Sequence, residues 1–322
     1  MQQLLDQRLS VEIKEFCCQL WSLSEVSLSM PCSNPCSMMR NDIWLLKTRQ
    51  YWVAEKTDGI RMFLILGVYD DLDGSEKKYS VFINRAFQLF LVDVQAPDEC
   101  YAGSLFDGEL VTTNTSDMTY TVFDTIAASG FNITHHPQSQ RIQATQLAFA
   151  AIQFNDPIIR VVVKQWYPIS NARLVYERAL HCDGLIFVPE HGPLLNGTQN
   201  DTFKWKVAAK HTIDFLLNSN GVLYLMDRTA IVEASVVAPF DLADTDHARA
   251  FISTSPVIIE CECVLNTVGG TPPIGGNGKK KWIATPIRVR TDKERANSVR
   301  VARATLQNIV ENVLLSEIEA CT

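Results

Sequence analysis

A lysine, an aspartate and a glycine stand between two apolar stretches of the sequence. The heptapeptide EKTDGIR occupies residues 55–61, where it connects the strand-like run 51–54 to the run 60–69. Asp-Gly pairs are typical of tight turns, so a surface turn explains Asp58-Gly59. A turn alone does not explain why Lys56 lies directly against such apolar flanks. The position of Lys56 beside apolar strands therefore needs a chemical explanation.

Charged residues interrupt many other strand-like stretches. Charges in strands that would otherwise be buried are costly unless they are paired or bind a ligand. One or two structural ion pairs are ordinary, but a set of this size indicates a lined cleft. The cations suit a triphosphate, and the carboxylates suit the divalent metal that accompanies it. The residues are Lys56, Asp58, Arg61, Arg85, Asp107, Glu109, Asp124, Asp183, Lys204, Lys206, Arg288, Arg290, Asp292 and Lys293.

The tripeptide Lys204-Trp205-Lys206 lies in an expected strand, which would fix the directions of its side chains. Alternate side chains of a strand share a face, so both lysines point one way and Trp205 the other. For a lone tripeptide of this kind, a solvated strand face is the simpler interpretation.

Hydrophobic periodicity predicts an α+β fold with an antiparallel sheet in the first two thirds of the chain. Helices are expected at 9–28, 140–152 and 171–180, with a Pro/Ser loop at 31–37. Many adjacent strands with helices added separately favour α+β over alternating βα units. The expected strands are 51–54, 60–69, 79–84, 87–93, 108–113, 119–126, 158–163, 184–188, 203–207 and 212–217.

The pattern changes after about residue 217. Short strands at 221–226, 230–237, 256–265 and 282–290 are separated by polar loops, including GGTPPIGGNGKKK at 269–281. Four or five short strands in a small region are typical of a small barrel such as an OB-fold. We therefore predict a first domain over 1–217 and an OB-fold domain over 218–297. An amphipathic helix is expected at 298–319, packing back on the first domain.

Length and composition indicate an ordinary globular protein. The 322 residues suggest about two domains, and 47% are apolar while 20% are charged. No apolar run approaches the ~18 residues of a membrane span, so no membrane partner is expected. The nine cysteines lack paired zinc spacing, which favours reduced thiols in an intracellular protein. A net charge of −7 argues against coating long nucleic acid, although a local basic site remains compatible with one nucleotide or one RNA end.

The order and spacing of the charged motifs resemble the covalent nucleotidyltransferase superfamily, which contains mRNA capping guanylyltransferases and polynucleotide ligases. Any one motif is unspecific, but the ordered set extends from about residue 55 to residue 293. The motifs are KTDGIR (56–61), INR (83–85), LFDGEL (105–110), VFD (122–124), CDGLIF (182–187), FKWK (203–206) and IRVRTDK (287–293).

Within that superfamily, the details are similar to capping guanylyltransferases. FKWK is soon followed by HTIDF (211–215), a capping-type continuation, and PCSNPCSMMR (31–40) resembles the loop that precedes the nucleotide pocket. The size and layout resemble the small stand-alone capping enzymes of large DNA viruses.

The resemblance implies that Lys56 is the nucleophile and forms a lysyl–GMP intermediate with GTP. A lysine must lose its proton to attack, and apolar surroundings together with Lys204 and Lys206 would favour the neutral amine. The resemblance also implies that Lys204 and Lys206 hold the α-phosphate, and that Asp183 is a metal-linked carboxylate. The metal is expected to be Mg²⁺ or Mn²⁺, with Glu109 as its second protein ligand.

Other nucleotide-binding roles follow from the same resemblance. Arg61, Arg85 and Glu109 would contact the ribose or orient the substrate, and Phe123 would stack on guanine. Lys164 would donate to guanine O6, although a lysine on an edge strand is the commoner explanation for this residue. Residues of the second domain would close over the β- and γ-phosphates of GTP; these are Arg290, Asp292 and Lys293.

The expected product is GpppN, made by transfer of GMP from Lys56 to the 5′-diphosphate end of RNA. The sequence contains no evident triphosphatase or methyltransferase, so separate proteins are expected to supply those steps. The main alternative is an ATP-dependent polynucleotide ligase that uses the same lysyl–nucleotide chemistry. A second alternative is a non-catalytic scaffold, but Lys56, Arg290 and Lys293 are all present.

Overall fold

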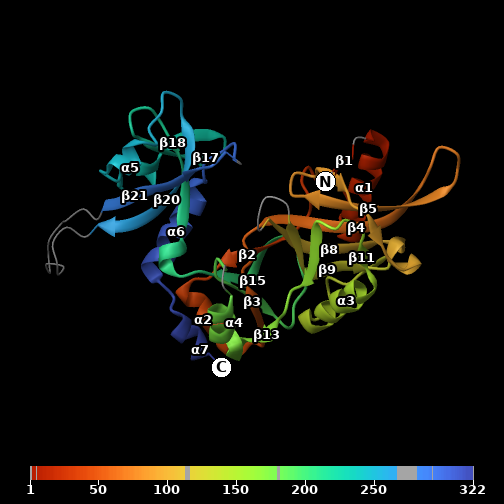
Figure 1. The fold of residues 1–322 in the computed structure, drawn as a ribbon. Helices are drawn as coiled ribbons and strands as arrows, with labels where there is room; N and C mark the ends of the chain where they lie inside the picture. Colours follow the sequence, from red (N-terminus) through yellow and green to blue (C-terminus); the bar gives the residue numbers. More distant parts are fainter. Residues whose placement is uncertain are drawn as a thin grey trace. The chain divides into compact units, whose positions relative to one another are not determined.

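The computed structural model describes residues 2–4, 6–112, 117–179, 182–266, 281–291 and 293–321. The fold is α+β, as the sequence predicts, and the chain divides into two compact units (Figure 1). The first unit comprises Met1–Cys36, Asp42–Trp205 and Leu315–Thr322, and the second comprises Ser37–Asn41 and Lys206–Leu314. None of the helices in the described part of the chain combines the length and apolarity that crossing a bilayer requires.

The larger sheet of the first unit has eight strands in the order β1-β6-β5-β4-β8-β9-β10, and β12 pairs with β9. Its central strand β4 is buried on both faces, from Met62 to Leu66, because helices cover the sheet on each side. α1 (Gln7–Leu20) packs on the Phe63 face and α3 (Gln138–Ala151) on the Leu64 face. The strands are β1 (Gln2–Gln3), β4 (Ile60–Asp70), β5 (Glu76–Asn84), β6 (Leu89–Leu91), β8 (Ser104–Thr112), β9 (Met118–Ala128), β10 (Phe131–Asn132) and β12 (Ile159–Val163).

The second sheet of the same unit carries the loop with Lys56. Its order is β13-β3-β14-β15-β2, and the short helices α2 (Ile43–Thr48), α4 (Ala172–Arg178) and α7 (Leu315–Glu319) pack together beside it (Figure 1). The strands are β2 (Ser33–Ser37), β3 (Tyr51–Glu55), β13 (Tyr167–Pro168), β14 (Leu185–Pro189) and β15 (Gly197–Trp205). A separate ribbon pairs β7 (Val94–Gln95) with β11 (Gln153–Phe154).

Helix α3 connects the two sheets of the first unit through buried polar contacts. Arg141, which is 2% exposed, donates from Nε to Asp124 Oδ1 of β9 at 2.9 Å. At the start of the helix, the Ser139 backbone N–H donates to Glu190 Oε2 at 3.1 Å. Glu190 follows β14 and also accepts a hydrogen bond from Trp52 of β3. Through these contacts, α3 links β9 of one sheet to the β3–β14 pair of the other.

The second unit is built on one six-stranded sheet with the order β18-β17-β16-β20-β21-β19. Its apolar core lies between this sheet and α6 (Val299–Glu311), whose start is capped by Ser298 Oγ accepting from the Val301 N–H at 3.2 Å. The other elements are β16 (Thr212–Leu217), β17 (Leu223–Asp227), β18 (Ala230–Glu233), β19 (Phe240–Leu242), α5 (Asp246–Arg249), β20 (Val257–Asn266) and β21 (Lys281–Val289). Closure of these strands into an OB-fold barrel stays a prediction.

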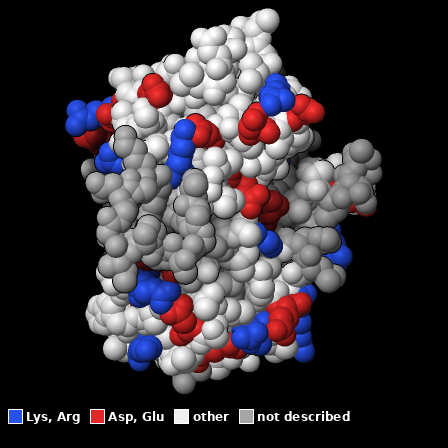
Figure 2. Space-filling model, turned by 90° about the vertical axis from the view of Figure 1, so that its left-hand side faces the viewer, with Lys and Arg blue, Asp and Glu red and all other residues white. Residues whose placement is uncertain are grey.

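Five short 3₁₀ helices complete the described secondary structure. They are Arg40–Asp42, Asp98–Ala102, Ile169–Asn171, Ala208–Lys210 and Ala234–Val236. Figure 2 shows one face of the molecule, on which lysines and arginines lie interspersed with aspartates and glutamates. The described side chains on that face form no extensive region of a single sign, in agreement with the net charge of −7.

The division between the units differs from the prediction of 1–217 and 218–297. It falls between Trp205 and Lys206, because residues 212–217 form β16 and pair along their whole length with β20 of the second sheet. The segment 37–41 also joins the second unit, where the Met38 carbonyl accepts a hydrogen bond from Asn308 of α6 at 2.7 Å.

Several elements also differ from the expected ones. The helix predicted at 298–319 is two helices, and only α7 belongs to the first unit, where Glu319 pairs with Arg173 at 2.6 Å. α1 ends at Leu20, just before Ser22 adopts a φ of 56°. The predicted loop at 31–37 contains β2, and two strand pairs are parallel, β12 with β9 and β19 with β21. Most of the loop 269–281 lies outside the described residues, which resume at Lys281.

Candidate active site

Lys56 is positioned by an extension of the pairing between β3 and β14. The Lys56 N–H donates to the Gly184 carbonyl at 2.8 Å, and the Asp183 N–H donates to the Lys56 carbonyl at 3.1 Å. These bonds continue the ladder in which Glu55 faces Leu185. They bring the Lys56 amine to 2.8 Å from Asp183 Oδ2. Two predicted site residues that are 127 positions apart in the sequence are thus direct neighbours.

The surroundings of Lys56 differ from the apolar setting that the sequence suggests. The Lys56 side chain is 23% exposed and that of Asp183 is 21% exposed. The apolar residues of β4 are buried in the two cores that flank its sheet. The nearest group to the amine is therefore a carboxylate, which attracts and orients the ammonium form.

Arg61 of β4 is anchored on the neighbouring strand. Its guanidinium donates two hydrogen bonds to Asp107 of β8, one of them from Nε at 2.9 Å, and a third to the Ser33 carbonyl at 2.7 Å. Burial opposes the charge on Arg61, but the attraction and hydrogen bonds of Asp107 outweigh it and raise the pKa of Arg61. For Asp107, burial is the larger effect and raises its pKa despite the neighbouring Arg61. The sequence includes Asp107 among the interrupting charges but does not identify it as the anchor of Arg61.

Glu109 lies on β8 directly across from Arg61. Its Oε1 accepts a hydrogen bond from the Gly59 N–H at 3.2 Å, which ties the loop with Lys56 to the larger sheet. Burial raises the pKa of Glu109, while the charges of Lys164 and Lys56 oppose that rise. Glu109 is therefore within electrostatic reach of both lysines.

The glycine of the KTDG sequence is explained by a close approach of two strands. A Cβ on Gly59 would lie 2.6 Å from the Leu110 carbonyl oxygen and 3.0 Å from Glu109 Cγ. Because real Cβ atoms essentially never come within 3.0 Å of a backbone atom, any side chain here would push the loop away from β8. Gly59 is thus required by packing, in addition to the turn that the sequence indicates.

Phe123 of β9 lies between two cations. Its ring centroid is 5.6 Å from the Lys164 amine and 5.7 Å from Arg61 Cζ. Its carbonyl accepts a hydrogen bond from Trp166 Nε1 at 3.2 Å, which fixes the backbone at this position. The ring is half-buried, so one part of it is accessible for stacking with a flat group.

Lys164 is the desolvated lysine of the site. It is 5% exposed, and its ammonium donates to the Glu55 carbonyl at 3.0 Å and to Thr57 Oγ1. Burial lowers the pKa of Lys164, an effect that the positive charge of Lys56 reinforces and the carboxylates of Glu55 and Glu109 oppose. Lys164 directly follows β12, so the alternative of a lysine on an edge strand stays open, although its side chain is buried.

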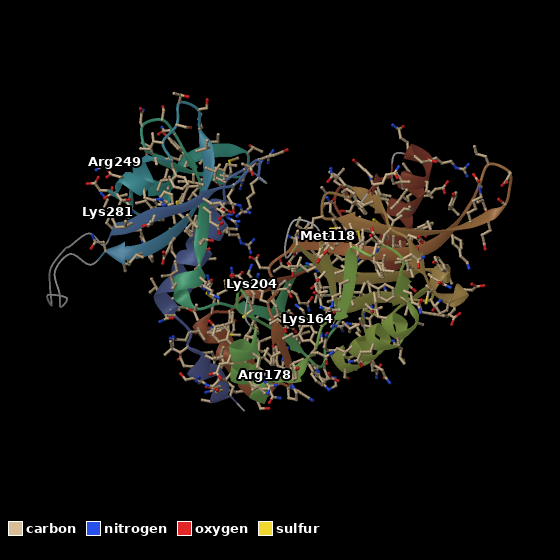
Figure 3. The ribbon with its side chains drawn as sticks, viewed as in Figure 1. Met118, Lys164, Arg178, Lys204, Arg249 and Lys281 are labelled. Carbon is tan, nitrogen blue, oxygen red and sulfur yellow. The ribbon has the colours of Figure 1, made fainter. Side chains whose placement is uncertain are left out.

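The remaining site residues of the first unit are Arg85 and Lys204. Arg85 is exposed and donates to Asn34 Oδ1. Lys204 lies on β15 opposite Ile186 and belongs to the same unit as Lys164 (Figure 3). Trp205 is 3% exposed and packs edge-on against Tyr176 with ring centroids 5.3 Å apart. β15 ends at Trp205, so Lys206 lies outside the strand, and the prediction that both lysines share one strand face stays a prediction.

The other predicted residues belong to the second unit. Arg290 donates to Asp214 Oδ1 at 3.0 Å, and the Lys293 amine contacts Asp214 Oδ2. Asp214 is 5% exposed on β16, where it interrupts the apolar sequence HTIDF, and the sequence did not identify it as a partner. Lys206 is half-buried and begins this unit, and Asp292 lies outside the described residues.

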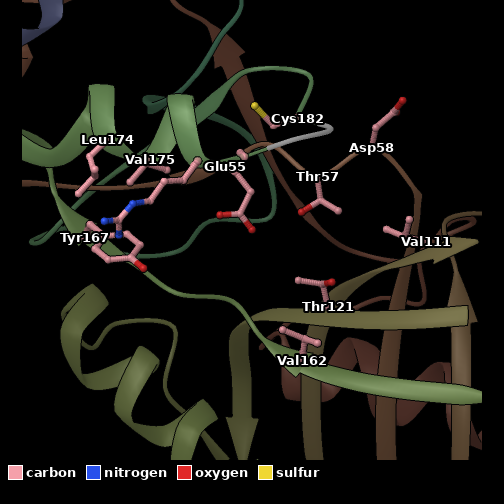
Figure 4. Close-up of a pocket in the computed structure, with 12 residues that line it drawn as sticks. Glu55, Thr57, Asp58, Val111, Thr121, Val162, Tyr167, Leu174, Val175 and Cys182 are labelled. Atoms are coloured by element: carbon pink, nitrogen blue, oxygen red, sulfur yellow. The ribbon is translucent and has the colours of Figure 1, made fainter. Parts of the chain in front are cut away.

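A cavity of about 580 Å³ opens in the first unit beside the Lys56 loop (Figure 4). Glu55, Thr57 and Asp58 form one side of it, and Thr121 and Val162 of the larger sheet form another. The remaining wall includes Leu174 and Val175 of α4. Its size is within the range of about 300–1,000 Å³ that is usual for small-molecule sites.

The described residues contain no group of three His, Cys, Asp or Glu side chains that could hold a metal ion by themselves. Magnesium is commonly bound through one or two carboxylates together with substrate phosphates and water. Asp183 contacts the Lys56 amine and Glu109 lies within electrostatic reach of it, so these two carboxylates are the candidates for such a site.

The fold and the site define an α+β protein with a lysine-centred cluster between two sheets. The profile described as "mRNA capping enzyme, catalytic domain" matches residues 1–208. Because the match covers more than half of the chain, the chain belongs to this family.

Relatives with known names support the same family. The chain is 25% identical over 244 residues to the mRNA-capping enzyme subunit alpha of Candida glabrata, a match that covers 64% of this chain and 53% of the relative. It is 25% identical over 241 residues to the subunit alpha of Saccharomyces cerevisiae, covering 64% and 51%. The mRNA-capping enzyme of Danio rerio is 25% identical over 333 residues, covering 94% and 52%. The chain thus spans about half the length of the curated relatives it matches, and the predicted likeness to viral enzymes stays a prediction.

Solved structures show more distant likeness. The ATP-dependent DNA ligase from bacteriophage T7 in complex with ATP is 12% identical with a TM-score of 0.38, covering 79% of this chain and 98% of the ligase. The ligase domain of LigD from M. tuberculosis is also 12% identical with a TM-score of 0.38, covering 81% and 94%.

Proposed function

We propose that the chain is an mRNA guanylyltransferase that forms a covalent lysyl–GMP intermediate and transfers GMP to RNA. The observation that carries the proposal is the contact between the Lys56 amine and the Asp183 carboxylate, within a cluster that also contains Glu109, Phe123 and Lys164. Membership of the capping-enzyme family supports the choice of reaction.

In the first step, Lys56 Nζ attacks the α-phosphorus of GTP. The Nζ–P bond forms while the bond between the α-phosphorus and the bridging oxygen breaks, and pyrophosphate leaves with that oxygen. The ammonium must lose its proton before the attack. Asp183 Oδ2, 2.8 Å away, is the nearest group that could hold that proton, and it keeps the amine in place until then.

In the second step, a terminal phosphate oxygen of 5′-diphosphate RNA attacks the same phosphorus. The Nζ–P bond breaks, the lysine takes up a proton, and GpppN is released. The half-buried ring of Phe123 is suited to stack on guanine, and Lys164 is suited to donate to its O6. Arg61 is held by Asp107, so we assign it to shaping the pocket and orienting the ribose together with Arg85 and Glu109.

Phosphate binding is proposed for the lysines of FKWK and for the cations of IRVRTDK. Lys204 and Lys206 are suited by charge to the α-phosphate, where negative charge develops during transfer. The β- and γ-phosphates are the proposed ligands of Arg290, Asp292 and Lys293.

We propose Mg²⁺ or Mn²⁺ as the cofactor, held by Asp183 and Glu109 together with the phosphates of GTP. The metal would neutralise charge on the triphosphate and on the departing pyrophosphate. Separate RNA triphosphatase and cap methyltransferase proteins are proposed partners. The name "subunit alpha" of the fungal relatives supports an enzyme that acts together with other subunits. We further propose an intracellular location without a membrane partner.

Covalent labelling separates this proposal from the ligase alternative. The protein is incubated with GTP or ATP radiolabelled at the α-phosphate, with magnesium or manganese, and the labelled chain is isolated under denaturing conditions. We expect a label from GTP that is lost in Lys56→Ala. The control Lys47→Ala removes an exposed lysine of α2 and should be labelled like the wild type. Labelling by ATP alone would favour the ligase reaction, and labelling of Lys56→Ala would mean that another residue is the nucleophile.

A further inference from the structure

Glu55 lines the 580 Å³ cavity, and the reaction steps proposed above assign no role to its carboxylate. Glu55 immediately precedes Lys56, and its side chain points into the cavity beside Thr57 (Figure 4). Val111, Val162 and Leu174 contribute apolar walls. The Glu55 carboxylate accepts no hydrogen bond from any residue that the structure describes. Glu55 is half-buried at the cavity wall, so its carboxylate can accept hydrogen bonds from a ligand that enters the cavity.

Two hydrogen-bond donors lie next to this carboxylate. The Lys164 ammonium gives two of its three hydrogens, to the Glu55 carbonyl and to Thr57 Oγ1, and the third has no acceptor among the described residues. Because Thr57 Oγ1 accepts from Lys164, its own hydrogen remains available for donation. Lys164 also lies within electrostatic reach of the Glu55 side chain. Glu55 and Thr57 thus line the cavity as an acceptor and a donor, and Lys164 contacts both of these residues from beside the cavity.

That arrangement is complementary to one nucleobase edge. Guanine presents an acceptor at O6 and, next to it, two donors at N1–H and the 2-amino group. Adenine presents a donor at its 6-amino group and an acceptor at N1, which places donor against donor and acceptor against acceptor at the same edge. We propose that Glu55 determines base specificity: its carboxylate accepts from guanine N1–H and from the 2-amino group, while Lys164 and Thr57 donate to O6. This inference rests on the proposed guanylyltransferase function, because it places the base of GTP in the cavity.

In this proposal Glu55 binds the base of GTP, whereas the neighbouring Lys56 reacts with the α-phosphorus. A bidentate contact to a charged group is stronger than a single one, and a polar group left unpaired in a buried site is costly. Inosine keeps O6 and N1–H but lacks the 2-amino group. Its triphosphate therefore removes one of the two hydrogen bonds to Glu55 and leaves every other contact of the substrate unchanged.

The experiment compares GTP with inosine triphosphate as donors in covalent labelling of Lys56. The rate constant divided by the apparent KM is measured for wild type, Glu55→Gln and Glu55→Ala. We expect wild type to prefer GTP about 10-fold, the effect of one hydrogen bond to a charged group. In Glu55→Ala, GTP should lose about 100-fold and inosine triphosphate about 10-fold, so that the preference disappears. Glu55→Gln keeps one acceptor oxygen but loses the charge, so its preference for GTP should be reduced to a smaller extent.

Glu76→Gln is the matched control, since Glu76 is an exposed glutamate on β5 outside the cavity. It should keep the wild-type preference. Glu55→Gln preserves the side-chain shape, and the thermal unfolding of each variant is measured alongside. An unchanged preference for GTP in Glu55→Ala and Glu55→Gln would overturn the role of Glu55 while leaving the guanylyltransferase proposal standing. Failure of GTP to label the wild type would overturn both.

Discussion

The amine of Lys56 and the carboxylate of Asp183 lie 2.8 Å apart, at the point where β3 and β14 stop pairing. Two backbone hydrogen bonds, from Lys56 N to Gly184 O and from Asp183 N to Lys56 O, place the two residues side by side. The proposed nucleophile is thus positioned by the same sheet that carries it. A charge placed next to the amine, and not an apolar enclosure, is the main feature of its surroundings.

Asp183→Asn tests the part that this charge plays. Asparagine keeps the shape of the side chain but removes its charge, so it can neither hold the proton that Lys56 must lose nor bind the proposed metal as a carboxylate. We expect the rate of lysyl–GMP formation at saturating GTP to fall about 100-fold, the low end of the effect of a positioned acid or base. The matched control is Asp201→Asn on β15, where the aspartate pairs with the exposed Arg49 at 3.3 Å. A rate within threefold of wild type in Asp183→Asn would contradict the role.

Glu109→Gln tests the pH dependence of the site. Burial raises the pKa of Glu109 above its ordinary value, so the carboxylate takes up a proton at a higher pH than a free glutamate does. On acidification the wild-type labelling rate should fall as Glu109 becomes neutral and releases the Gly59 N–H. Glu109→Gln should be slower at neutral pH and should lack this acid limb. The pH profile of labelling provides the measurement, with Glu12→Gln on the exposed surface of α1 as control.

The same residue predicts a change in stability with pH. Between the ordinary pKa of glutamate and the raised pKa of Glu109, the folded state binds more protons than the unfolded state. The free energy of unfolding contributed by Glu109 therefore decreases as the pH rises through that window. Urea unfolding measures the free energy of unfolding of wild type and of Glu109→Gln. The wild-type value minus the variant value should decrease as the pH rises through that window, and an increase would contradict the raised pKa.

Arg141→Met should destabilise the first unit strongly. Arg141 is 2% exposed and pairs with Asp124, whose side chain is 9% exposed, so the variant leaves a buried carboxylate without its cation. Removing one partner of a buried ion pair costs about 3–5 kcal/mol of unfolding free energy. Adding Asp124→Asn should recover part of that loss, since the remaining charge is removed. Urea unfolding of the single and double variants measures both effects.

The exposed pair between Arg173 and Glu319 is the control for Arg141. It joins α4 to α7 at 2.6 Å, but Arg173 is 49% exposed and Glu319 30% exposed. Arg173→Met should therefore lower the unfolding free energy far less than Arg141→Met does. Equal losses in the two methionine variants would mean that burial does not control the strength of these pairs.

The sequence predicted most of the secondary structure because periodicity is a local property. The apolar run at 60–69 predicted a strand, and β4 is that strand. Its burial between α1 on one side and α3 on the other follows only from the packing. The spacing of apolar residues after 298 indicated a helix, and α6 begins at Val299. The C-terminal limit of that helix could not be predicted, because α7 continues the pattern but packs in the first unit.

The sequence could not predict which charged side chains pair with one another. Arg61 and Asp107 are 46 residues apart, and their contact depends on the register of β4 against β8. The same holds for Arg290 with Asp214, 76 residues apart across two strands of the other sheet. A sequence shows that such charges interrupt apolar strands, but a change of register by one residue would turn each of them to the opposite face.

The sequence by itself determined the identity and order of the charged motifs, and with them the prediction that Lys56 and Glu109 act in the site. Only the tertiary structure decided which lysine is desolvated. It is Lys164, which is 5% exposed against the Glu55 carbonyl and Thr57, whereas Lys56 keeps a carboxylate beside it. The physical reason is that desolvation and pairing depend on every element packed around a side chain, and those elements come from distant parts of the chain.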